Sequence, residues 1–556
     1  MKARVLLRLL GAYTIALVIG CLVVRARATL TPTPPARRVV VASTWGGGKL
    51  AERTMRLDGE APVPSLGGLG DAHHVEEVAV AEAPLSLWKA TFPLALVSGI
   101  DGLRAELDGR TLWVTTDDLL AAQAYDHAAT FLDPSLGMGV DREVVLGILE
   151  RGLGAARADI LDRATFTRVR FERRVVGAAP RKRITGADID RDEVRRAISE
   201  AAQFLARSMD GQGRYRYTID ATSDASVGGY NWPRHAGTTY FMAQAAALLG
   251  DGMVRYAAVR AAHAMADELT RDCGENRCIA EGDEASVGAS ALALIAYAEL
   301  LRTHTDDTLR ASALELARFL RSQQRADGEL MHFYDRVKKR PVDVQVMYYT
   351  GEAALALSRV HRVTGDAADL DAASRALANL SGKGWSFFGS RYYFAEEHWT
   401  CQAVADLWDR APNEDALAFC LRWHEYQRRL QHEEGDSPFD ADGSFGFSPL
   451  VTPRITPASS RGEAAVAALD VVKKKGDTAT AALLDDELRR ALAFVMRSQL
   501  RPGPHHLFAR PDVTRGGFPG SAVDYQLRID YAQHAGSMMI RFLEVTGPSL
   551  APRSRE

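Results

Sequence analysis

Side chains that could do acid–base chemistry lie directly beside short runs of small and apolar residues. At 230–244 the sequence YNWPRHAGTTYFMAQ places an Arg and a His before such a run, and AEEHW at 395–399 places two carboxyl groups and a His. QHAG at 533–536 repeats the pattern near the end of the chain. Imidazole and carboxyl groups can take and return protons near neutral pH, so these stretches predict a reaction site. The candidate catalytic residues are His235, Glu397, His398, His534 and Asp283.

Aromatic and charged side chains near the same runs could bind a ligand. Ligand sites combine apolar and aromatic walls with a few polar groups, a combination that suits the faces and hydroxyl groups of a sugar. We therefore expect a carbohydrate or another small molecule. The candidate substrate-binding residues are Tyr230, Trp232, Arg234, Tyr348, Tyr349, Trp399, Arg454 and Asp530. No spacing of Cys and His resembles a zinc site, so we expect neither a metal nor a cofactor.

These stretches belong to a set of six with a shared design. Each has a polar or aromatic residue, then a glycine or cysteine, then a helical run that is small and apolar nearly all round, which predicts a buried helix. Between them lie six amphipathic helices with Arg and Glu along one stripe, such as 191–209. The marker positions are Gly237, Gly288, Gly351, Cys401, Gly462 and Gly536.

The alternation predicts six helical hairpins over 189–548, and six hairpins can close into a ring, an (α/α)6 toroid. A straight solenoid is the alternative, but solenoids need polar caps at their ends. In a toroid the segments before the inner helices meet around a central funnel, where helix N-termini favour negative groups. Glu352 and Glu463 directly follow marker glycines, and we interpret them as first-turn acids or as bonds between hairpins.

The six-hairpin pattern resembles the (α/α)6 superfamilies, which include six-hairpin glycosidases, sugar epimerases and lyases, and the terpenoid-cyclase and prenyltransferase toroids. The resemblance covers about 360 residues and is architectural, and a fold does not fix a function. The Asp-rich acid motif of terpenoid cyclases is not evident, and the Cys-Cys-His zinc set of lanthionine cyclases is absent. The glucosamine 2-epimerase and glucuronyl C5-epimerase families place His, Arg, Tyr or Glu around the funnel, and RHAG, AEEHW and QHAG resemble that type of site.

Three carbohydrate reactions stay open at this point. A hydrolase would use Glu397 and either Asp283 or Glu284 as acid and base across the funnel. An epimerase or lyase would instead exchange a proton beside a carboxylate, using imidazoles.

In that second case His235 would work with His534 or His398, and Arg234 would bind the anion. Two alternatives come from other classes of protein. One is a non-catalytic toroid that binds a glycan or a protein partner at the cell envelope. The other is an isoprenoid-binding protein similar to terpenoid cyclases.

The first residues predict export. Basic residues flank an apolar run at 9–24, which is a little shorter than the roughly 20 residues that span a bilayer. We interpret 1–28 as a signal anchor with residues 5–24 in the membrane; lipid attachment at Cys21 and cleavage after Ala28 are the alternatives. Each places the body of the protein outside the cytoplasm, at the cell envelope. The net charge of −3 gives no basic field for nucleic acid.

Two further segments and four cysteines complete the domain prediction. Pro and Gly in 29–80 predict a flexible linker, and mixed strand and helix patterns in 81–185 predict a small α+β domain. Cys273 and Cys278 flank a turn and could pair in an oxidising compartment or stay as thiols. Cys401 and Cys420 are interpreted as small core residues.

Overall fold

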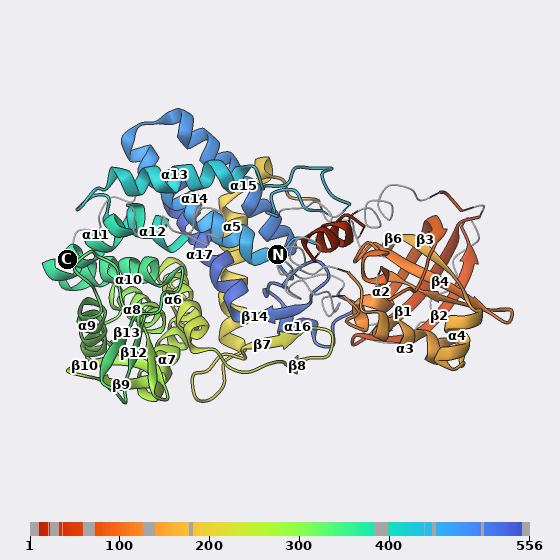
Figure 1. Ribbon diagram of the computed structural model, residues 1–556, viewed down its shortest axis with the longest axis horizontal. Coiled ribbons are helices and arrows are strands. Elements are labelled where there is room, and N and C mark those ends of the chain that lie inside the picture. Colours follow the sequence, from red (N-terminus) through yellow and green to blue (C-terminus); the bar gives the residue numbers. More distant parts are fainter. Residues whose placement is uncertain are drawn as a thin grey trace, which may run out of the picture.

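The protein consists of a small sheet domain and a larger helical domain (Figure 1). The computed structural model describes residues 10–20, 22, 33–35, 37–58, 73–89, 91–125, 139–176, 182–382, 398–438, 440–446, 452–501 and 505–547.

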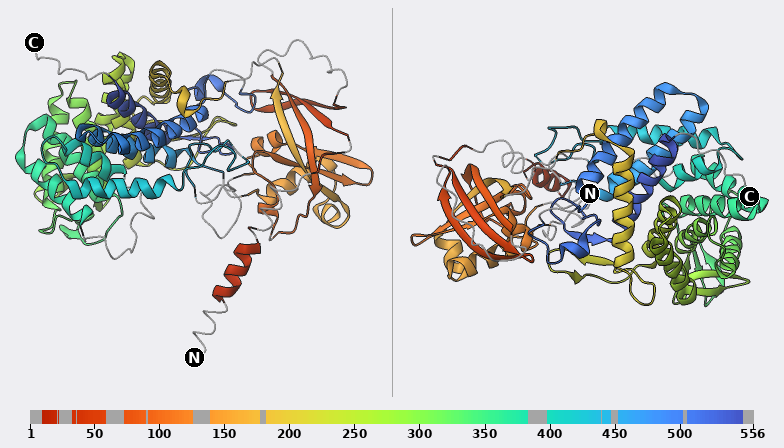
Figure 2. Two further views of the ribbon diagram at one scale, coloured as in Figure 1. Left: turned by 90° about the horizontal axis from the view of Figure 1, so that it is seen from above. Right: turned by 180° about the vertical axis from the view of Figure 1, so that it is seen from behind.

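The predicted membrane anchor at residues 5–24 is not supported. Residues 10–20 form a mostly exposed helix that stands apart from both domains (Figure 2). Among the described residues no helix is long and apolar enough to cross a membrane. Cys21 and Ala28 lie outside the described residues.

The small domain is an antiparallel sheet of six strands in the order β2-β1-β3-β6-β4-β5. Short helices accompany the sheet, and the β4–β5 hairpin turns at a glycine with positive φ, as the DGR sequence predicts. The strands are β1 Val39–Gly46, β2 Lys49–Leu57, β3 His73–Pro84, β4 Asp101–Leu107, β5 Arg110–Val114 and β6 Thr165–Val175; the helices are α2 Thr116–Ala121, α3 Arg142–Leu153 and α4 Arg157–Arg163.

The linker prediction for 29–80 is wrong for residues 39–57 and for the start of β3, because these form three strands of the sheet. The glycines of WGGGK mark a hairpin turn between β1 and β2, where Gly47 and Gly48 adopt positive φ. The run VVVAS that precedes them is β-branched and mostly buried, which is typical of a strand. The glycines that suggested a flexible linker therefore belong to a tight turn between two strands.

The helical domain is a closed ring of six inner helices surrounded by six outer helices. Each inner helix contacts the next one, and α17 contacts α6, which closes the ring. This confirms the predicted (α/α)6 toroid. The inner helices are α6 Trp232–Leu249, α8 Val287–Leu301, α10 Tyr349–Thr364, α12 His398–Leu407, α14 Ile455–Lys475 and α17 Ile529–Thr546. The outer helices are α5 Arg191–Arg207, α7 Gly252–Leu269, α9 Asp307–Ser322, α11 Ala367–Ser381, α13 Glu414–Arg428 and α15 Thr478–Ser498.

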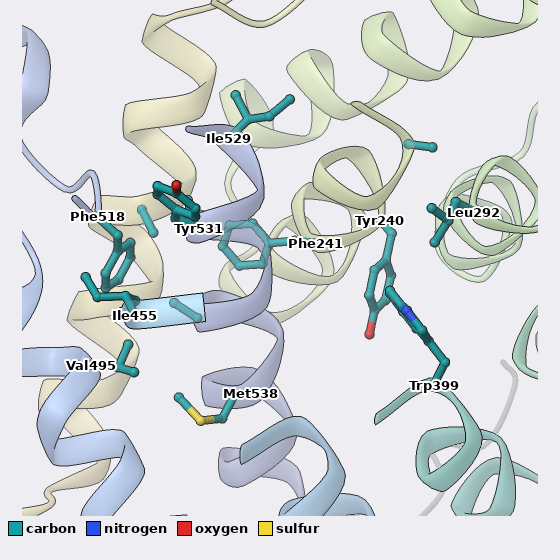
Figure 3. Close-up of a cluster of buried hydrophobic side chains, with 14 of the residues drawn as sticks. Tyr240, Phe241, Leu292, Trp399, Ile455, Val495, Phe518, Ile529, Tyr531 and Met538 are labelled. Atoms are coloured by element: carbon teal, nitrogen blue, oxygen red, sulfur yellow. The ribbon is translucent and has the colours of Figure 1, made fainter. Parts of the chain in front are cut away.

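The marker glycines allow inner helices to touch. A Cβ at Gly462 would overlap the side chain of Met538, and a Cβ at Gly536 would overlap the ring of Phe241. Figure 3 shows Phe241 and Met538 within the cluster of buried side chains between these helices. Since each glycine faces the neighbouring inner helix, small residues at the markers set the close spacing that the sequence predicted.

The connections that lead into the inner helices carry short strands. One sheet runs in the order β13-β12-β11-β10-β9, and a second pairs β14-β7-β8, so neighbouring connections are tied together where the inner helices begin. The strands are β7 Thr218–Asp220, β8 Ala225–Ser226, β9 Thr270–Cys273, β10 Asn276–Glu281, β11 Glu284–Ser286, β12 Phe333–Asp335, β13 Arg340–Val342 and β14 Gln526–Arg528.

The small domain docks on the connection before α17. His506 of this connection donates from Nε2 to Asp117 Oδ2 at 2.7 Å, and its ring packs against Trp45. Gln123 of the small domain hydrogen-bonds Asp220 and Thr222 of the toroid. The small domain thus holds the segments that lead into α17 and α6.

Both cysteine pairs form disulfides. The sequence left open whether Cys273 and Cys278 pair or stay as thiols, and in the structure they form a disulfide. Cys401 and Cys420 are buried, but they are not simply core residues: they join α12 to α13 with Cα atoms 5.8 Å apart, within the range of a disulfide. The prediction missed this bond because the two cysteines face each other only once the hairpin forms.

Candidate active site

Two histidines and a glutamate meet on the inner side of the ring. His398 begins α12, Glu463 lies on α14, and His534 lies on α17. Glu463 Oε2 is 2.8 Å from His534 Nδ1 and 3.8 Å from His398 Nε2, and the two imidazole centroids are 5.2 Å apart. We call these three residues the His–Glu–His cluster. Two of them, His398 and His534, were candidate catalytic residues from the sequence.

The contact with Glu463 sets the chemistry of His534. A carboxylate oxygen accepts, so Nδ1–H of His534 donates to Glu463 and the basic lone pair of the neutral ring lies on Nε2. Glu463 itself is completely buried, and its Oε1 has no hydrogen-bond partner among the described residues. A buried carboxylate beside two imidazoles stabilises the protonated form of either ring.

An aromatic wall adjoins the cluster. The ring of Trp399 lies 4.5 Å from that of His398 and 6.0 Å from that of His534, between centroids. The side chain of His534 is 12% exposed, whereas His398 and Glu463 have 2% and 0%. His534 is therefore the member of the cluster that an incoming ligand would meet first.

Beneath the cluster the ring interior is filled with polar side chains. Gln402 and Ser537 directly follow the marker positions of α12 and α17. Both reach the hydroxyl of Tyr240 on α6, with oxygens at 3.4 and 2.8 Å. The position after the marker thus faces the ring interior on these two helices, as it does for Glu463 on α14.

Nearer the C-terminal ends of the inner helices, buried ion pairs fill the interior. Asp406 accepts from Arg359 at 2.9 Å and from Arg541 at 3.1 Å, and Glu299 lies 3.3 Å from Arg359. Arg359 also packs 4.6 Å over the ring of Tyr240. Burial would raise the pKa of Asp406, but the surrounding guanidinium groups lower it. Because this end is filled, we expect a ligand to approach from the face where the inner helices begin.

Paired charges line that face. Arg454 donates to Asp524 at 3.0 Å and to the hydroxyl of Tyr531 at 3.1 Å. Arg528 pairs with Asp530 at 2.6 Å. Tyr531 lies three residues before His534 on the same helix, so these groups stand about one helical turn above the cluster. Two of the predicted binding residues, Arg454 and Asp530, belong to this rim.

Asp530 lies four residues before His534 on α17, about one helical turn away, but it does not hold the imidazole. Asp530 bonds Arg528 and lies 3.3 Å from Nε of Arg234, while Glu463 holds the imidazole. Arg234 also donates to the hydroxyl of Tyr217 at 2.7 Å. The two nearby guanidinium groups outcompete a neutral ring for the carboxylate.

His235 lies outside the cluster, between α6 and α7. Its Nε2–H donates to the carbonyl of Ala261 at 2.9 Å, which leaves Nδ1 to accept from the hydroxyl of Tyr230 at 2.6 Å. Burial lowers the pKa of His235 to about 4. Trp232 packs against the same ring, with centroids 4.9 Å apart. His235, Tyr230 and Trp232 thus form a neutral packing cluster, and we do not include them in the proposed site.

The remaining predicted residues are spread along the chain. Asp283 and Glu284 are exposed at a turn after β10. Tyr348 is 43% exposed. Tyr349, the first residue of α10, packs against Tyr348 and against His332. Glu397 lies outside the described residues, so its pairing with Asp283 or Glu284 stays a prediction.

Glu463 is the member of the cluster that was not among the candidate site residues, because it was interpreted as a first-turn acid or a bond between hairpins; it does bond α14 to α17. Its signal was its register: it follows a marker glycine, as Gln402 and Ser537 follow theirs. The three side chains of the cluster could also hold a divalent ion, since their ligand atoms all lie within 4.8 Å of one another. Two imidazoles and a carboxylate suit zinc or iron.

No family model matches the sequence, and no curated protein matches it. Similar solved structures include a D-mannose isomerase (TM-score 0.49, 11% identity, covering 64% of this chain and 98% of that one). A cellobiose 2-epimerase from Bacillus thermoamylovorans has a TM-score of 0.48 at 12% identity, with coverage of 64% and 98%. An unsaturated glucuronyl hydrolase specific for heparin has 0.47 at 10%, again with 64% and 98%.

All three structures are (α/α)6 toroids, the class that the sequence resembles. In this chain the ring is closed by the contacts of each inner helix with the next and of α17 with α6.

Proposed function

We propose that the protein is an enzyme that epimerises or isomerises a carbohydrate by proton transfer at the His–Glu–His cluster. The observation that carries the proposal is the pair of imidazoles, 5.2 Å apart, that share one fully buried carboxylate inside the ring. Trp399 packs beside them with 5% of its surface exposed, and this exposed part would give a sugar an apolar contact, as aromatic walls do in ligand sites.

The chemistry follows from the proton positions. His534 Nε2 takes the proton from the carbon beside the carbonyl of an open-chain sugar, and the electron pair moves to the carbonyl oxygen, giving an enediolate. His398 then returns a proton to carbon. Return to the same carbon from the opposite face gives an epimer. Return to the former carbonyl carbon gives an isomer, and the hydroxyl proton then moves from one enediolate oxygen to the other. Glu463 stabilises whichever ring is protonated during these steps. Protons and electrons balance, because one proton leaves the substrate and one returns.

The rim favours an uncharged sugar. Arg454 and Arg528 each have their own carboxylate partner, Asp524 and Asp530, at 3.0 and 2.6 Å. Arg234 also lies 3.3 Å from Asp530. The guanidinium group that we expected to bind an anionic substrate therefore already has a carboxylate partner in the protein. A uronate would have to displace these partners, which costs desolvated hydrogen bonds.

We also propose that the body works outside the cytoplasm. Support comes from the disulfides Cys273–Cys278 and Cys401–Cys420, since structural disulfides persist mainly in oxidising compartments. Attachment to the membrane through the first residues stays a prediction.

The test is deuterium exchange in heavy water. The full chain is incubated with mannose, cellobiose, glucose and glucuronate, and NMR follows deuterium at the carbon beside the carbonyl. We expect exchange and a new sugar isomer with at least one neutral sugar, and loss of both in His534→Asn and His398→Asn. Binding of a sugar without exchange would indicate a non-catalytic glycan-binding toroid. Absence of both binding and exchange would overturn the carbohydrate proposal.

A further inference from the structure

A second glutamate occupies the register position of Glu463 on another inner helix. Glu352 directly follows Gly351 on α10, as Glu463 directly follows Gly462 on α14, within the sequences TGEAA and RGEAA. The same position on α12 and α17 holds Gln402 and Ser537, which face the ring interior. By this register Glu352 belongs to the layer of side chains that contains Glu463.

Glu352 differs from Glu463 in having no ion pair or imidazole contact within the part of the chain that the structure describes. It is 3% exposed, and its Oε2 is buried without a hydrogen-bond partner among the described residues. Gly288 on α8 makes room for it, because a Cβ there would lie 2.7 Å from this oxygen. The marker glycine of α8 therefore accommodates a carboxyl group as well as a neighbouring helix.

The environment keeps this carboxyl group neutral. Burial raises the pKa of Glu352 well above its ordinary range, and no cation among the described residues offsets the effect. The adjacent Tyr349 also has a raised pKa, to about 12, mainly by burial, so it brings no charge near neutral pH. A protonated carboxyl group carries an O–H that can donate a hydrogen bond.

An unsatisfied buried polar group costs folding free energy, and a Leu or Gln at this position would avoid burying an acid. Groups that cost stability and serve no packing purpose are typical of functional sites. By its register this one lies in the same layer as Glu463, which hydrogen-bonds His534 and lies 3.8 Å from His398.

We propose that Glu352 is a catalytic residue of the same site, donating its O–H to the carbonyl oxygen of the bound sugar. This inference rests on the proposed function. When His534 removes the carbon proton, negative charge develops on that oxygen, and a neutral carboxyl group held in a dry site stabilises it by a hydrogen bond. No proton needs to leave Glu352, so the proton count of the reaction is unchanged.

The test compares Glu352→Leu and Glu352→Gln in the full chain, by deuterium exchange, steady-state kinetics and thermal unfolding. We expect the Leu variant to lower kcat by about 100-fold with KM within about threefold, because one donor to a developing oxyanion is worth about that much. The Gln variant keeps an N–H donor and should recover about tenfold of the loss. The Leu variant should keep or raise Tm by about 1–3 °C, because it no longer buries an unpaired acid.

The outcomes separate this inference from the proposed function. Wild-type exchange with unchanged kcat in both variants would overturn the role of Glu352 and leave the proposed function standing. A fall in Tm with unchanged kcat would also overturn it, because Glu352 would then be a structural residue. Absence of exchange in the wild-type protein, with Glu352→Leu still raising Tm, would overturn the proposed function itself and the catalytic role with it.

Discussion

In the described part of the chain, two pairs of histidine and glutamate share nearly the same geometry. His534 and Glu463 lie 2.8 Å apart inside the ring, and His424 and Glu487 lie 2.9 Å apart between the outer helices α13 and α15. Both glutamates are almost fully buried. A distance and a pair of residue types therefore do not distinguish a reaction site from a packing contact.

The surroundings distinguish them. The His424 side chain is 1% exposed, Arg428 lies 3.7 Å from Glu487, and Gln431 donates to the Glu487 carbonyl at 2.9 Å. This pair is a packing contact that joins α13 to α15. The ring pair instead has a partly exposed imidazole, a second imidazole and an indole beside it. Access and a second titratable group are what a site needs, and only the ring pair combines them.

The largest expected effect separates the two histidines. His534→Asn should lower kcat by about 1000-fold, because it removes the proposed base, with little change in Tm. His424→Asn should lower Tm and leave the kcat of the folded protein unchanged. Steady-state kinetics and thermal unfolding of both variants check this. Equal loss of kcat in both would erase the distinction between the pairs.

The two glutamates give the next largest contrast. Glu463→Gln should lower kcat by about 100-fold, because a neutral amide no longer stabilises a protonated imidazole. Glu487→Gln should instead lower the free energy of unfolding by about 2 kcal/mol, because a hydrogen bond to a charged group is lost. Urea unfolding and kinetics on the same preparations separate the effects. A stable Glu487→Gln variant with reduced kcat would contradict our interpretation.

A third buried histidine sharpens the comparison through pH. The folded pKa of His235 is about 4, below its ordinary value of 6.5, because the ring is buried. The unfolded chain therefore binds more protons, so this stability is complete above pH 6.5 and is lost as the pH falls toward 4. Between pH 7 and pH 5 we expect a loss of about 2 kcal/mol. Urea unfolding of the wild type and of His235→Gln at both pH values measures it; an equal loss in both would exclude His235 as the source.

The smallest expected effect concerns the aromatic wall. Trp399→Leu should raise KM about tenfold and change kcat little, because it removes a stacking surface but no titratable group. Trp423, a fully buried tryptophan on α13, provides the control: Trp423→Leu should lower Tm without raising KM. Unchanged KM in Trp399→Leu would place the sugar elsewhere in the ring.

The sequence predicted the architecture well, because the repeat of small residues at the six markers is a local pattern with a packing cause. His398 and His534 were found for the same reason, since each stands at the start of an inner helix or within its first two turns. Glu463 was missed because its partner is 71 residues away in the chain, and only ring geometry joins them. Cys401 and Cys420 escaped similarly, although a cysteine at a marker position was a signal that the fourth hairpin differs from the others.

The same limit explains the misplaced His235. It also applies to Asp530, which lies one turn from His534 on the same helix but is bound by Arg528, two residues before it, and by Arg234 of α6. The position of His235 before a marker glycine suggested the ring interior, but the carbonyl of Ala261 on α7 accepts its proton. Helical periodicity predicts which residues share a face of a helix. It does not predict which residue of another element will hydrogen-bond a polar side chain on that face.

The closed ring also determines how the toroid comes apart. α17 contacts both α6 and α5, and Arg191 at the start of α5 donates to Thr546 at the end of α17. An open array of repeats can fray from its terminal units, which have one neighbour each. Each hairpin here has two neighbours, so releasing any one of them breaks two interfaces at once. The toroid should consequently unfold in a single cooperative step, and a permuted chain with its ends moved to another connection should rebuild the same ring.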